Sequence, residues 1–388
     1  MSVFLDDRRK AGAGKRKKVE KDMENPAEPR PFSVSPEAAE EYESSLERLL
    51  SEMDREMEAE PEIDRLVGGQ LAMMRQNHRH HAVFMASVFR LNDSELLDQT
   101  VRWVYRAYLS HGFLPGYFPL ELEKWKEVLG RLLSAQAAGE IHKVYDWMLE
   151  RHEVYTRLAE QHREESPEGI STRWGTVRDS FLEGLLRGEI ERCLAAARDS
   201  VKSREELEEF YDEVVWTAMK EIGNRWEKGT LTVAQEHLAT AIVSRVLSVL
   251  FDRFWHPASK KAKAVIAASC NEFHELGARA VGDLLEIDGW EVHYLGSNLP
   301  VEALVETVQR VRPFLLGISV TIPFNLRKAE EAIRLIRSKE ELSGMKILLG
   351  GGAFRESGDL WKRLGADACP MNAREALKTA NDFLGQRP

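Results

Sequence analysis

Cysteines and long apolar runs are both scarce in this chain of 388 residues, and each shortage excludes a class of protein. Cys193, Cys270 and Cys369 are widely spaced and odd in number, so neither a disulfide framework nor a structural zinc site is expected. No run approaches the ~18 apolar residues of a membrane span, and the charged amino terminus lacks the apolar core of a secretory signal. We therefore expect a cytoplasmic protein with no membrane partner.

Positive charge is also in the minority, because the net charge is -10. This balance argues against general nucleic-acid binding. One basic stretch, Arg8–Lys18, could contact an acidic partner, but its glycines and its lack of apolar residues favour a solvated tail. Residues 1 to 35 show no periodicity and end among prolines, so the sequence predicts a disordered leader.

The region from 36 to 163 has the apolar spacing of helices and no alternating strand pattern. Its aromatic and histidine residues are His78, His80, His81, Trp103, Tyr105, Tyr108, His111, Phe113, Tyr117, Phe118 and Trp125. One interpretation is a dimerisation domain with an aromatic core. The other is a pocket for a flat anionic pigment, in which the histidines, Arg75 or Arg79 meet its carboxylates and the aromatics cover its ring plane.

Residues 164 to 173 look like a linker, and a second helical region spans 174 to 256. Its helices are predicted at 176–187, 189–200, 204–222 and 232–253, and the short connections favour a four-helix bundle. Thr232 and Gln235 resemble a capping box at the start of the last helix. Glu236 and His237 therefore lie at this start, close to the connection that follows Trp226.

From 262 to 388 the pattern changes to strands that alternate with helices. Strands are predicted at 263–270, 291–295, 314–319, 345–349 and 366–369, and helices begin near 278, 301, 325, 354 and 373. Five such units predict a doubly wound α/β domain with a parallel five-stranded sheet in the flavodoxin-like order. Ligands of such sheets bind beyond the carboxyl ends of the strands, at the switch point between the first and the third.

Polar residues and glycines follow three of these strands. After the first strand, His274 lies in the loop before the helix, where Glu272 can accept a hydrogen bond from one ring nitrogen and leave the other free for a metal. Gly277 permits a close backbone approach where that helix begins. Ser319 and Thr321 follow the third strand, and Gly350 and Gly351 follow the fourth. A simple phosphate site is the alternative, but its glycine-rich loop belongs after the first strand.

At these residues the sequence resembles the cobalamin-binding domain of methionine synthase, corrinoid proteins and B12 photoreceptors. The resemblance implies that His274 is the lower ligand of the cobalt and Glu272 its hydrogen-bond partner, within an acidic-x-His-x-x-Gly motif that ends at Gly277. It implies that the detached benzimidazole tail of the cofactor is received by Ser319, Thr321, Gly350 and Gly351. The bundle before this domain is similar to the helical cap over the upper face of the corrin.

Within the cap, Trp226, nine intervening residues and then Glu236 and His237 resemble the signature of adenosylcobalamin photoreceptors of the CarH type. In that family the tryptophan packs against the adenosyl group and the glutamate side contacts it. The alternative is a core aromatic with a polar helix face. Glu227 stands where the family has the histidine that captures cobalt after photolysis, so a bis-histidine light state is not implied.

The helix-turn-helix domain of those repressors has no counterpart, so direct DNA binding is not expected. A cap behind a different helical domain resembles the photocobilins, which pair B12 with biliverdin. The leading hypothesis is therefore a non-enzymatic light sensor, in which photolysis of adenosylcobalamin changes domain or subunit packing, with biliverdin as an optional second chromophore.

Such a sensor is expected to be a homo-oligomer with a downstream protein partner. The rivals are a corrinoid methyl-carrier protein for a methyltransferase and a cobalamin-sensing or storage module without photochemistry. Mutase chemistry is not expected, since no (β/α)8 pattern accompanies the motif.

Overall fold

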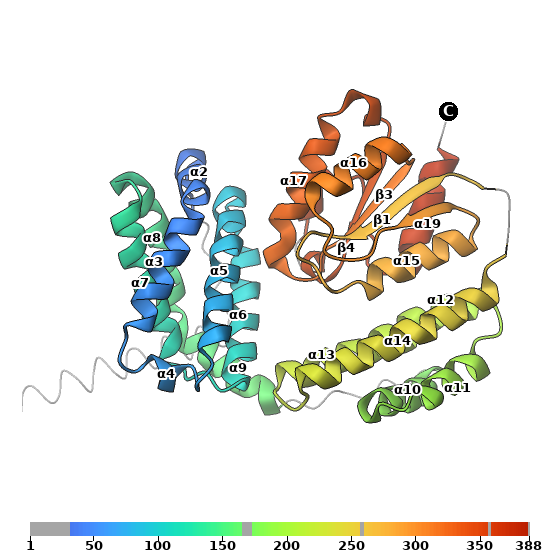
Figure 1. Ribbon diagram of the computed structural model, residues 1–388, viewed down its shortest axis with the longest axis horizontal. Helices are drawn as coiled ribbons and strands as arrows, with labels where there is room; N and C mark the ends of the chain where they lie inside the picture. The colour runs from blue at the N-terminus through green and yellow to red at the C-terminus, as the bar shows by residue number, and fades with distance from the viewer. Residues whose placement is uncertain (1–31, 165–172, 257–259, 356–357, 387–388) are drawn as a thin grey trace, which may run out of the picture. The chain divides into compact units, whose positions relative to one another are not determined.

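The computed structural model describes residues 32–164, 173–256, 260–355 and 358–386, without the side chains of 162–164 (Figure 1). The chain divides into two compact units, Met1–Pro167 and Glu168–Pro388, and the boundary falls inside the predicted linker. Most of the predicted leader, residues 1 to 31, lies outside the described residues. Its last residues are anchored, because the amide of Val34 donates to Asn92 Oδ1 at 2.7 Å and the amide of Ser35 donates to Glu140 Oε2 at 2.7 Å.

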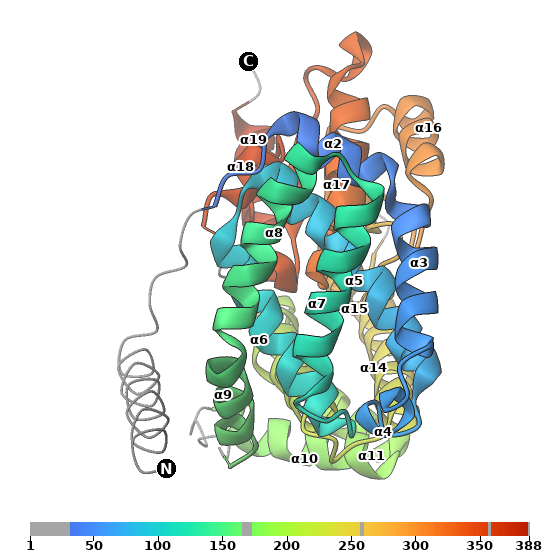
Figure 2. The ribbon, with the colours of Figure 1, turned by 90° about the vertical axis from the view of Figure 1, so that its left-hand side faces the viewer.

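The described part of the first unit consists of helices and turns, which confirms the helical prediction for this region. Its helices are α2 (Pro36–Ser44), α3 (Leu46–Glu58), α4 (Ile63–Leu66), α5 (Leu71–Leu91), α6 (Ser94–Ser110), α7 (Tyr117–Leu132), α8 (Ala135–Glu150) and α9 (His152–Glu164). Figure 2 looks onto α3, α7 and α8, which lie side by side. Ser35, Asp93 and Ser134 cap α2, α6 and α8, because each side chain accepts a hydrogen bond from an otherwise unpaired amide.

Most of the aromatic side chains singled out in the sequence form the core of this unit. Tyr105 stacks on Phe118 with 3.9 Å between ring centroids, and Phe113 meets Tyr117 edge-on at 4.9 Å. Trp125 is fully buried and contacts the ring of His81 at 5.4 Å. His80, Trp103, Tyr108 and His111 are partly buried. Arg75 and Arg79 lie instead at the surface, beside Glu58 and Glu47.

A polar network crosses the same core. Asn77 donates to Tyr117 Oη at 3.1 Å and to Glu121 Oε1 at 3.0 Å. Burial raises the pKa of Glu121 above its usual range. His78 is fully buried, and its Nδ1 lies 2.6 Å from Asp54 Oδ1. Asn77 and Glu121 therefore pair with each other, whereas His78 Nε2 and Ser87 Oγ are buried without a hydrogen-bond partner among the described atoms.

The cap region of the second unit begins with α10 (Gly175–Arg187) and α11 (Ile190–Ser200). One continuous helical run follows, made of α12 (Arg204–Glu209), the π-helical segment η1 (Phe210–Trp216) and α13 (Thr217–Glu227). The predicted third helix, 204–222, therefore ends five residues too early. The capping box predicted for α14 (Val233–Phe254) is confirmed, because Thr232 and Gln235 each accept the other's backbone amide hydrogen.

The α/β domain contains a parallel sheet in the order β2-β1-β3-β4. The strands are β1 (Lys263–Ala268), β2 (Glu291–Tyr294), β3 (Leu315–Ser319) and β4 (Lys346–Gly350). The α-helices are α15 (Leu276–Ile287), α16 (Val301–Val311), α17 (Leu326–Arg337), α18 (Leu360–Arg363) and α19 (Ala373–Gly385), and the short 3-10 helices are η2 (Pro323–Asn325), η3 (Glu340–Leu342) and η4 (Gly352–Phe354). In Figure 1, α15 and α19 lie on one face of the sheet and α16 and α17 on the other.

The predicted fifth strand, 366–369, is wrong as a strand within the described residues. Only Ala368 pairs with β4, through a single parallel bridge to Leu348. The side chain of Asp367 accepts the amide hydrogen of Ile347 at 2.7 Å, and Pro370 has no amide hydrogen to donate. A side chain and a proline thus interrupt the ladder that a fifth strand requires.

One hydrophobic core joins the cap to the α/β domain. It runs from Phe210 and Leu247 in the cap to Leu284 in α15 and Ala380 in α19. In Figure 1, α14 lies along α15. The cap and the α/β domain therefore fold as parts of one unit.

Candidate functional site

Glu272 is the buried anchor of the loop after β1, with only 1% of its side chain exposed. Its Oε2 accepts hydrogen bonds from the amides of Thr321 at 2.8 Å and Ile322 at 2.9 Å, and from Asn325 Nδ2 at 3.1 Å. Its Oε1 accepts from the amide of His274 at 3.1 Å. One carboxylate therefore ties the end of β1 to the loop after β3.

His274 is held by the same carboxylate but faces outward. Its Nδ1 lies 2.5 Å from Glu272 Oε1, while 55% of its side chain is exposed. A neutral imidazole that donates Nδ1–H to a carboxylate presents a lone pair on Nε2, which is the arrangement of a metal-binding histidine. The predicted pairing of these two side chains is therefore present in the structure.

The electrostatics of this pair favour an ionised carboxylate. Burial alone would raise the pKa of Glu272, but hydrogen bonds from His274 and Ile322 outweigh burial and lower the pKa to about 2. The hydrogen bond to Glu272 raises the pKa of His274, burial opposes this, and the charge of Glu236 in the cap adds to the rise.

Asparagines that the sequence analysis missed complete this loop. Asn325 donates both to Glu272 and to the carbonyl of Asn271, at 3.3 Å. The side chain of Asn298 accepts the amide hydrogen of Asn271 at 3.0 Å, and both of these residues have positive φ angles, 53° and 62°. Asparagine tolerates the left-handed region better than most residues, so its recurrence after β1 and β2 was the available signal.

The ends of β3 and β4 meet beside this loop, as predicted. Ser319 pairs in register with Ala268 of β1 and with Gly350 of β4. Gly351 has a φ of 102°, and a Cβ there would lie 2.3 Å from the carbonyl oxygen of Val320. Only glycine fits this approach, so the loop after β4 can lie flat against the end of β3. Thr321 is partly buried. It lies against Gly352, because a Cβ added at Gly352 would lie 3.0 Å from the Thr321 carbonyl oxygen.

The cap contributes Trp226 near the end of α13, and Glu236 and His237 in the first turn of α14. Trp226 is partly buried at the edge of the cap core. Glu236 accepts a hydrogen bond from Thr240 Oγ1 at 3.0 Å, and His237 is exposed, with its Nε2 3.9 Å from Glu236 Oε2. Glu227 is buried. The signature residues therefore lie at one corner of the cap, where α13 ends and α14 begins.

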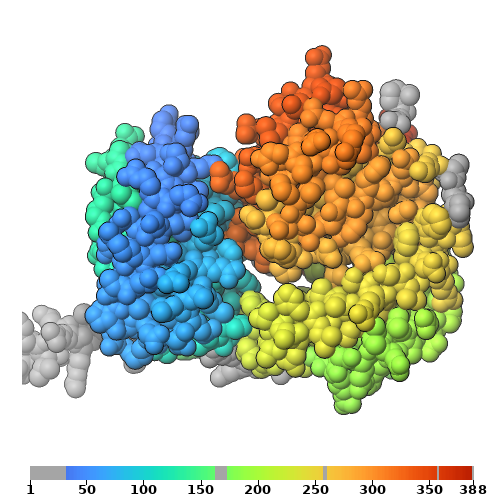
Figure 3. Space-filling view, in the orientation of Figure 1, coloured from blue at the N-terminus to red at the C-terminus, as the bar shows by residue number. Residues whose placement is uncertain are grey.

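Open space lies between this corner and the strand ends. The space-filling view is hollowed between the yellow start of α14 and the orange loops of the α/β domain (Figure 3). A Cβ added at Gly277, in the first turn of α15, would meet no atom within 4 Å. The site thus combines an outward imidazole, a glycine-lined strand edge and an open space beneath the cap.

Comparison with known families identifies the class of domain. Residues 177–251 and residues 262–380 each match a family model described as a B12 binding domain. The second unit therefore carries B12-binding domains, and binding of a cobalamin by this chain is supported.

Individual relatives fall into two groups. The dimethylamine corrinoid protein of Methanosarcina barkeri is 26% identical over 212 residues, which cover 52% of this chain and 98% of that protein. The HTH-type transcriptional repressor CarH of Myxococcus xanthus is 32% identical over 155 residues, which cover 40% of this chain and 50% of that protein. The solved monomethylamine corrinoid protein of M. barkeri aligns with 53% of this chain and 96% of its own, with a TM-score of 0.47 and 21% identity.

The residues present fit a cobalamin. His274 could ligate the cobalt because its Nδ1 is already bound by Glu272. Ser319, Thr321, Gly350 and Gly351 lie together at the ends of β3 and β4, at the strand edge that would accept the tail of the cofactor. When it is bound, the cobalamin would supply a cobalt centre. The chain would supply His274 as a ligand, the edge formed by the ends of β3 and β4, and a helical cover.

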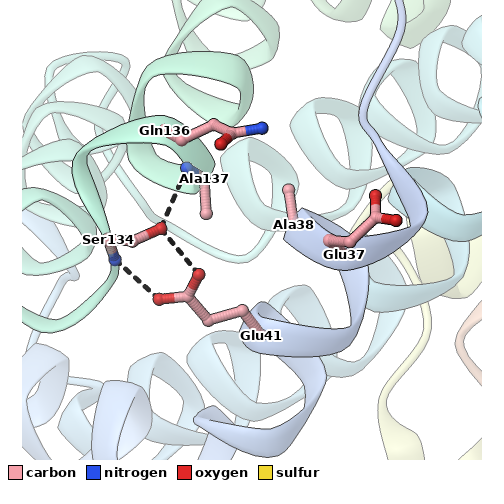
Figure 4. A pocket seen from close by; sticks show the side chains of 6 residues that line it. All are labelled: Glu37, Ala38, Glu41, Ser134, Gln136 and Ala137. Carbon is pink, nitrogen blue, oxygen red and sulfur yellow. Dashed lines mark hydrogen bonds between the residues drawn. The ribbon is translucent and has the colours of Figure 1, made fainter.

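A small recess in the first unit is a separate feature. It has a volume of about 130 Å³ and is lined by Glu37, Ala38, Glu41, Ser134, Gln136 and Ala137 (Figure 4). The carboxylate of Glu41 accepts from the amide of Ser134 at 2.6 Å and from its hydroxyl at 2.7 Å. These bonds lower the pKa of Glu41 and fix the start of α8.

Among the described residues, no helix has both the length and the apolar character needed to cross a bilayer.

Proposed function

We propose that this protein is a cobalamin-binding light sensor of the cytoplasm, in which photolysis of adenosylcobalamin changes domain or subunit packing. Bound adenosylcobalamin would supply a carbon–cobalt bond that light can break. The observation that carries the proposal is the position of Trp226 and Glu236 together at one corner of the cap, at the end of α13 and the start of α14. The partial similarity to the repressor CarH supports it.

The residues of the chain have distinct roles in this proposal. His274 would hold the cobalt, and Glu272 fixes the orientation of the imidazole. Trp226 offers an aromatic surface to the adenine of the upper ligand, and Glu236 offers a carboxylate to the hydroxyl groups of the nucleoside. Without an upper ligand, Trp226 and Glu236 would lose these contacts, so the cap would be held less strongly and the population of packing arrangements would shift.

A corrinoid methyl-carrier protein is the second candidate. The dimethylamine corrinoid relatives favour it, because the match covers 98% of the length of the protein from M. barkeri. The two functions differ in what the upper face must allow. A methyl carrier must expose a one-carbon group to a partner, whereas a sensor must cover a nucleoside, so a bulky indole at Trp226 favours the sensor.

The test is the absorption spectrum of the full chain, loaded with adenosylcobalamin in the dark and then exposed to green light. We expect a light-driven spectral change and a change in the size-exclusion profile. We also expect Trp226→Ala to weaken adenosylcobalamin binding and to spare methylcobalamin. Trp255→Ala is the matched control, since Trp255 lies at the far end of α14. Equal binding of both cobalamins by the wild type, with an elution profile indifferent to light, would favour the methyl carrier.

A bilin in the first unit is a separate part of the proposal. It is supported by the polar groups enclosed among the aromatic rings, where His78 Nε2 is buried without a hydrogen-bond partner among the described atoms. Mixing the chain with biliverdin should produce a red-shifted band that His78→Ala alters. A band that persists after removal of residues 1 to 163 would assign the bilin elsewhere, and absence of any band would favour a dimerisation domain.

A further inference from the structure

The π-helical segment η1 carries two aromatic residues that both contact the α/β domain, Tyr211 and Trp216. They are five positions apart, which in an α-helix would place them about 140° apart around the axis. In a π turn the backbone hydrogen bonds join residues five positions apart, so such residues come toward the same face of the helix. The irregular segment therefore lets one helix direct both rings at the neighbouring domain.

Tyr211 faces α15. Its hydroxyl is buried, and burial followed by the facing charge of Asp283 raises its pKa well above the usual range. Arg279, one turn before Asp283, donates to Ser244 Oγ and Ser248 Oγ of α14, both at 2.8 Å. The cap is thus attached to α15 by side chains from two of its helical runs.

Trp216 reaches the loop after β4. The guanidinium carbon of Arg355 lies 4.2 Å from the centroid of the indole, which is close enough for an attractive cation–π contact. Arg355 directly follows η4, and η4 directly follows the Gly351 that packs on Val320. The contact therefore joins the cap to the strand edge that would accept the cofactor tail.

The helix between the two tryptophans is uninterrupted. From Trp216, α13 runs to Glu227 and includes Trp226, a rise of about 15 Å over ten residues. Because no break separates the two residues, we expect a shift of Trp216 to be passed along α13 to Trp226.

We infer that Trp216 and Arg355 form a latch that positions Trp226 over the strand ends, with the π turn as the docking element of the cap. Occupancy of the tail channel would act on the loop that carries Arg355, and α13 would convey it to the upper face. The effect on ligand preference rests on the function proposed above, whereas the latch itself does not.

The latch can be tested in the cobalamin-free full chain by hydrogen exchange resolved to residues 217–227. Trp216→Ala and Arg355→Ala should each accelerate exchange there by roughly threefold to tenfold. The double variant should add little to either, because both changes break the same contact. Trp216 is 41% exposed and Trp255 is 39% exposed, so Trp255→Ala is the matched control and should leave this segment unchanged.

Trp216→Phe keeps an aromatic ring, so residues 217–227 should retain most of their protection from hydrogen exchange. This variant separates loss of the cation–π contact from a general folding defect. Unchanged exchange in both single variants, or fully additive effects in the double variant, would overturn the latch.

A second measurement separates positioning from simple stability. Trp216→Ala should reduce the preference for adenosylcobalamin over methylcobalamin in the same direction as Trp226→Ala, whereas Trp255→Ala should preserve it. If Trp226→Ala leaves the preference intact, the proposed upper-face role fails, whatever the exchange data show. If Trp226→Ala abolishes the preference and Trp216→Ala does not, the positioning role fails while the proposed function stands.

Discussion

Each unit of the chain contains a histidine paired through Nδ1 with a carboxylate at almost the same distance, but the burial of the two partners is reversed. In the first unit His78 is 0% exposed and Asp54 is 33% exposed, with 2.6 Å between Nδ1 and Oδ1. In the second unit Glu272 is 1% exposed and His274 is 55% exposed, with 2.5 Å between Nδ1 and Oε1. The same chemical pair therefore has opposite orientations relative to its core.

The orientation determines what each pair can do. A buried imidazole with an acid at its edge fills the core, and its second nitrogen faces protein. A buried acid with an outward imidazole holds a ligand in place and leaves its second nitrogen for an external atom. The first arrangement stabilises the fold, whereas the second uses part of the fold to present one atom.

The largest expected effect comes from removal of the two acids. Glu272→Ala leaves the amides of Thr321 and Ile322 and the side chain of Asn325 without their acceptor, so we expect a loss of ~3–5 kcal/mol in unfolding free energy. Asp54→Ala leaves only His78 Nδ1 unpaired and should cost ~1–2 kcal/mol. Urea unfolding followed by unit-resolved hydrogen exchange measures both. Glu272→Gln should lose an intermediate amount of unfolding free energy, because its side chain keeps one acceptor oxygen. Equal losses for Glu272→Ala and Asp54→Ala would contradict the expectation that the buried acid contributes more.

Removal of the two histidines should separate stability from binding. His78→Ala leaves a cavity in a packed core and should cost ~2–4 kcal/mol without changing cobalamin affinity. His274→Ala should cost less than ~1 kcal/mol, because the side chain is exposed, but it should weaken cobalamin binding or alter the cobalt spectrum. Urea denaturation and a cobalamin titration check the two halves. An unchanged spectrum and affinity in His274→Ala would remove this residue from the site.

The two units should also differ in their response to pH. Burial lowers the pKa of His81 in the first unit to about 3, so its neutral form is favoured and its contribution to stability is lost as the pH falls from about 6.5 toward 3. Burial raises the pKa of Asp283 in the second unit to about 7, although Arg279 opposes it, so its contribution is lost as the pH rises from about 4 through 7.

The corresponding variants isolate these terms from the rest of the titration. His81→Phe should flatten the acid-side dependence of the unfolding free energy of the first unit on pH. Asp283→Asn should flatten the corresponding dependence of the second unit between about pH 4 and 7. Each change should amount to ~1–3 kcal/mol across its pH range. Amide hydrogen exchange in α5 and in α15, measured between pH 4 and pH 8, reports on the two units separately. Slopes that stay parallel to the wild type in both variants would show that other groups control the pH dependence.

The sequence was sufficient for those parts of the site that depend on short separations or on strand order. Glu272 and His274 are two residues apart in one loop, so their contact could be expected, and the parallel order brings Ser319 to Gly350. The contacts of Asn325 with the same carboxylate span more than fifty residues and depend on the path of a loop, which periodicity does not specify.

Other features were beyond pattern reasoning for definable physical reasons. The π turn at 210–216 adds one residue to a helical register and leaves the apolar spacing helical, so the sequence predicted an ordinary helix. The aromatic residues of the first unit have the same spacing whether they contact a ligand or one another, and the structure packs Tyr105 on Phe118. The fifth strand was lost because the Asp367 carboxylate accepts the amide hydrogen of Ile347 and because Pro370 has no amide hydrogen to donate.

The smallest expected effect compares two glycines that lie on helices with open space around them. A Cβ would meet no atom within 4 Å at Gly139 in α8 or at Gly277 in α15. Alanine favours a helix over glycine by up to ~1 kcal/mol, so neither substitution should destabilise its unit. The open space at Gly277 lies beside His274, and a methyl group there would occupy room that a bound corrin needs. Gly277→Ala should therefore reduce cobalamin affinity severalfold at unchanged or slightly higher stability, and Gly139→Ala should show the gain in stability alone. Thermal unfolding and cobalamin titration of the two variants measure this, and equal affinities would place the cofactor away from the first turn of α15.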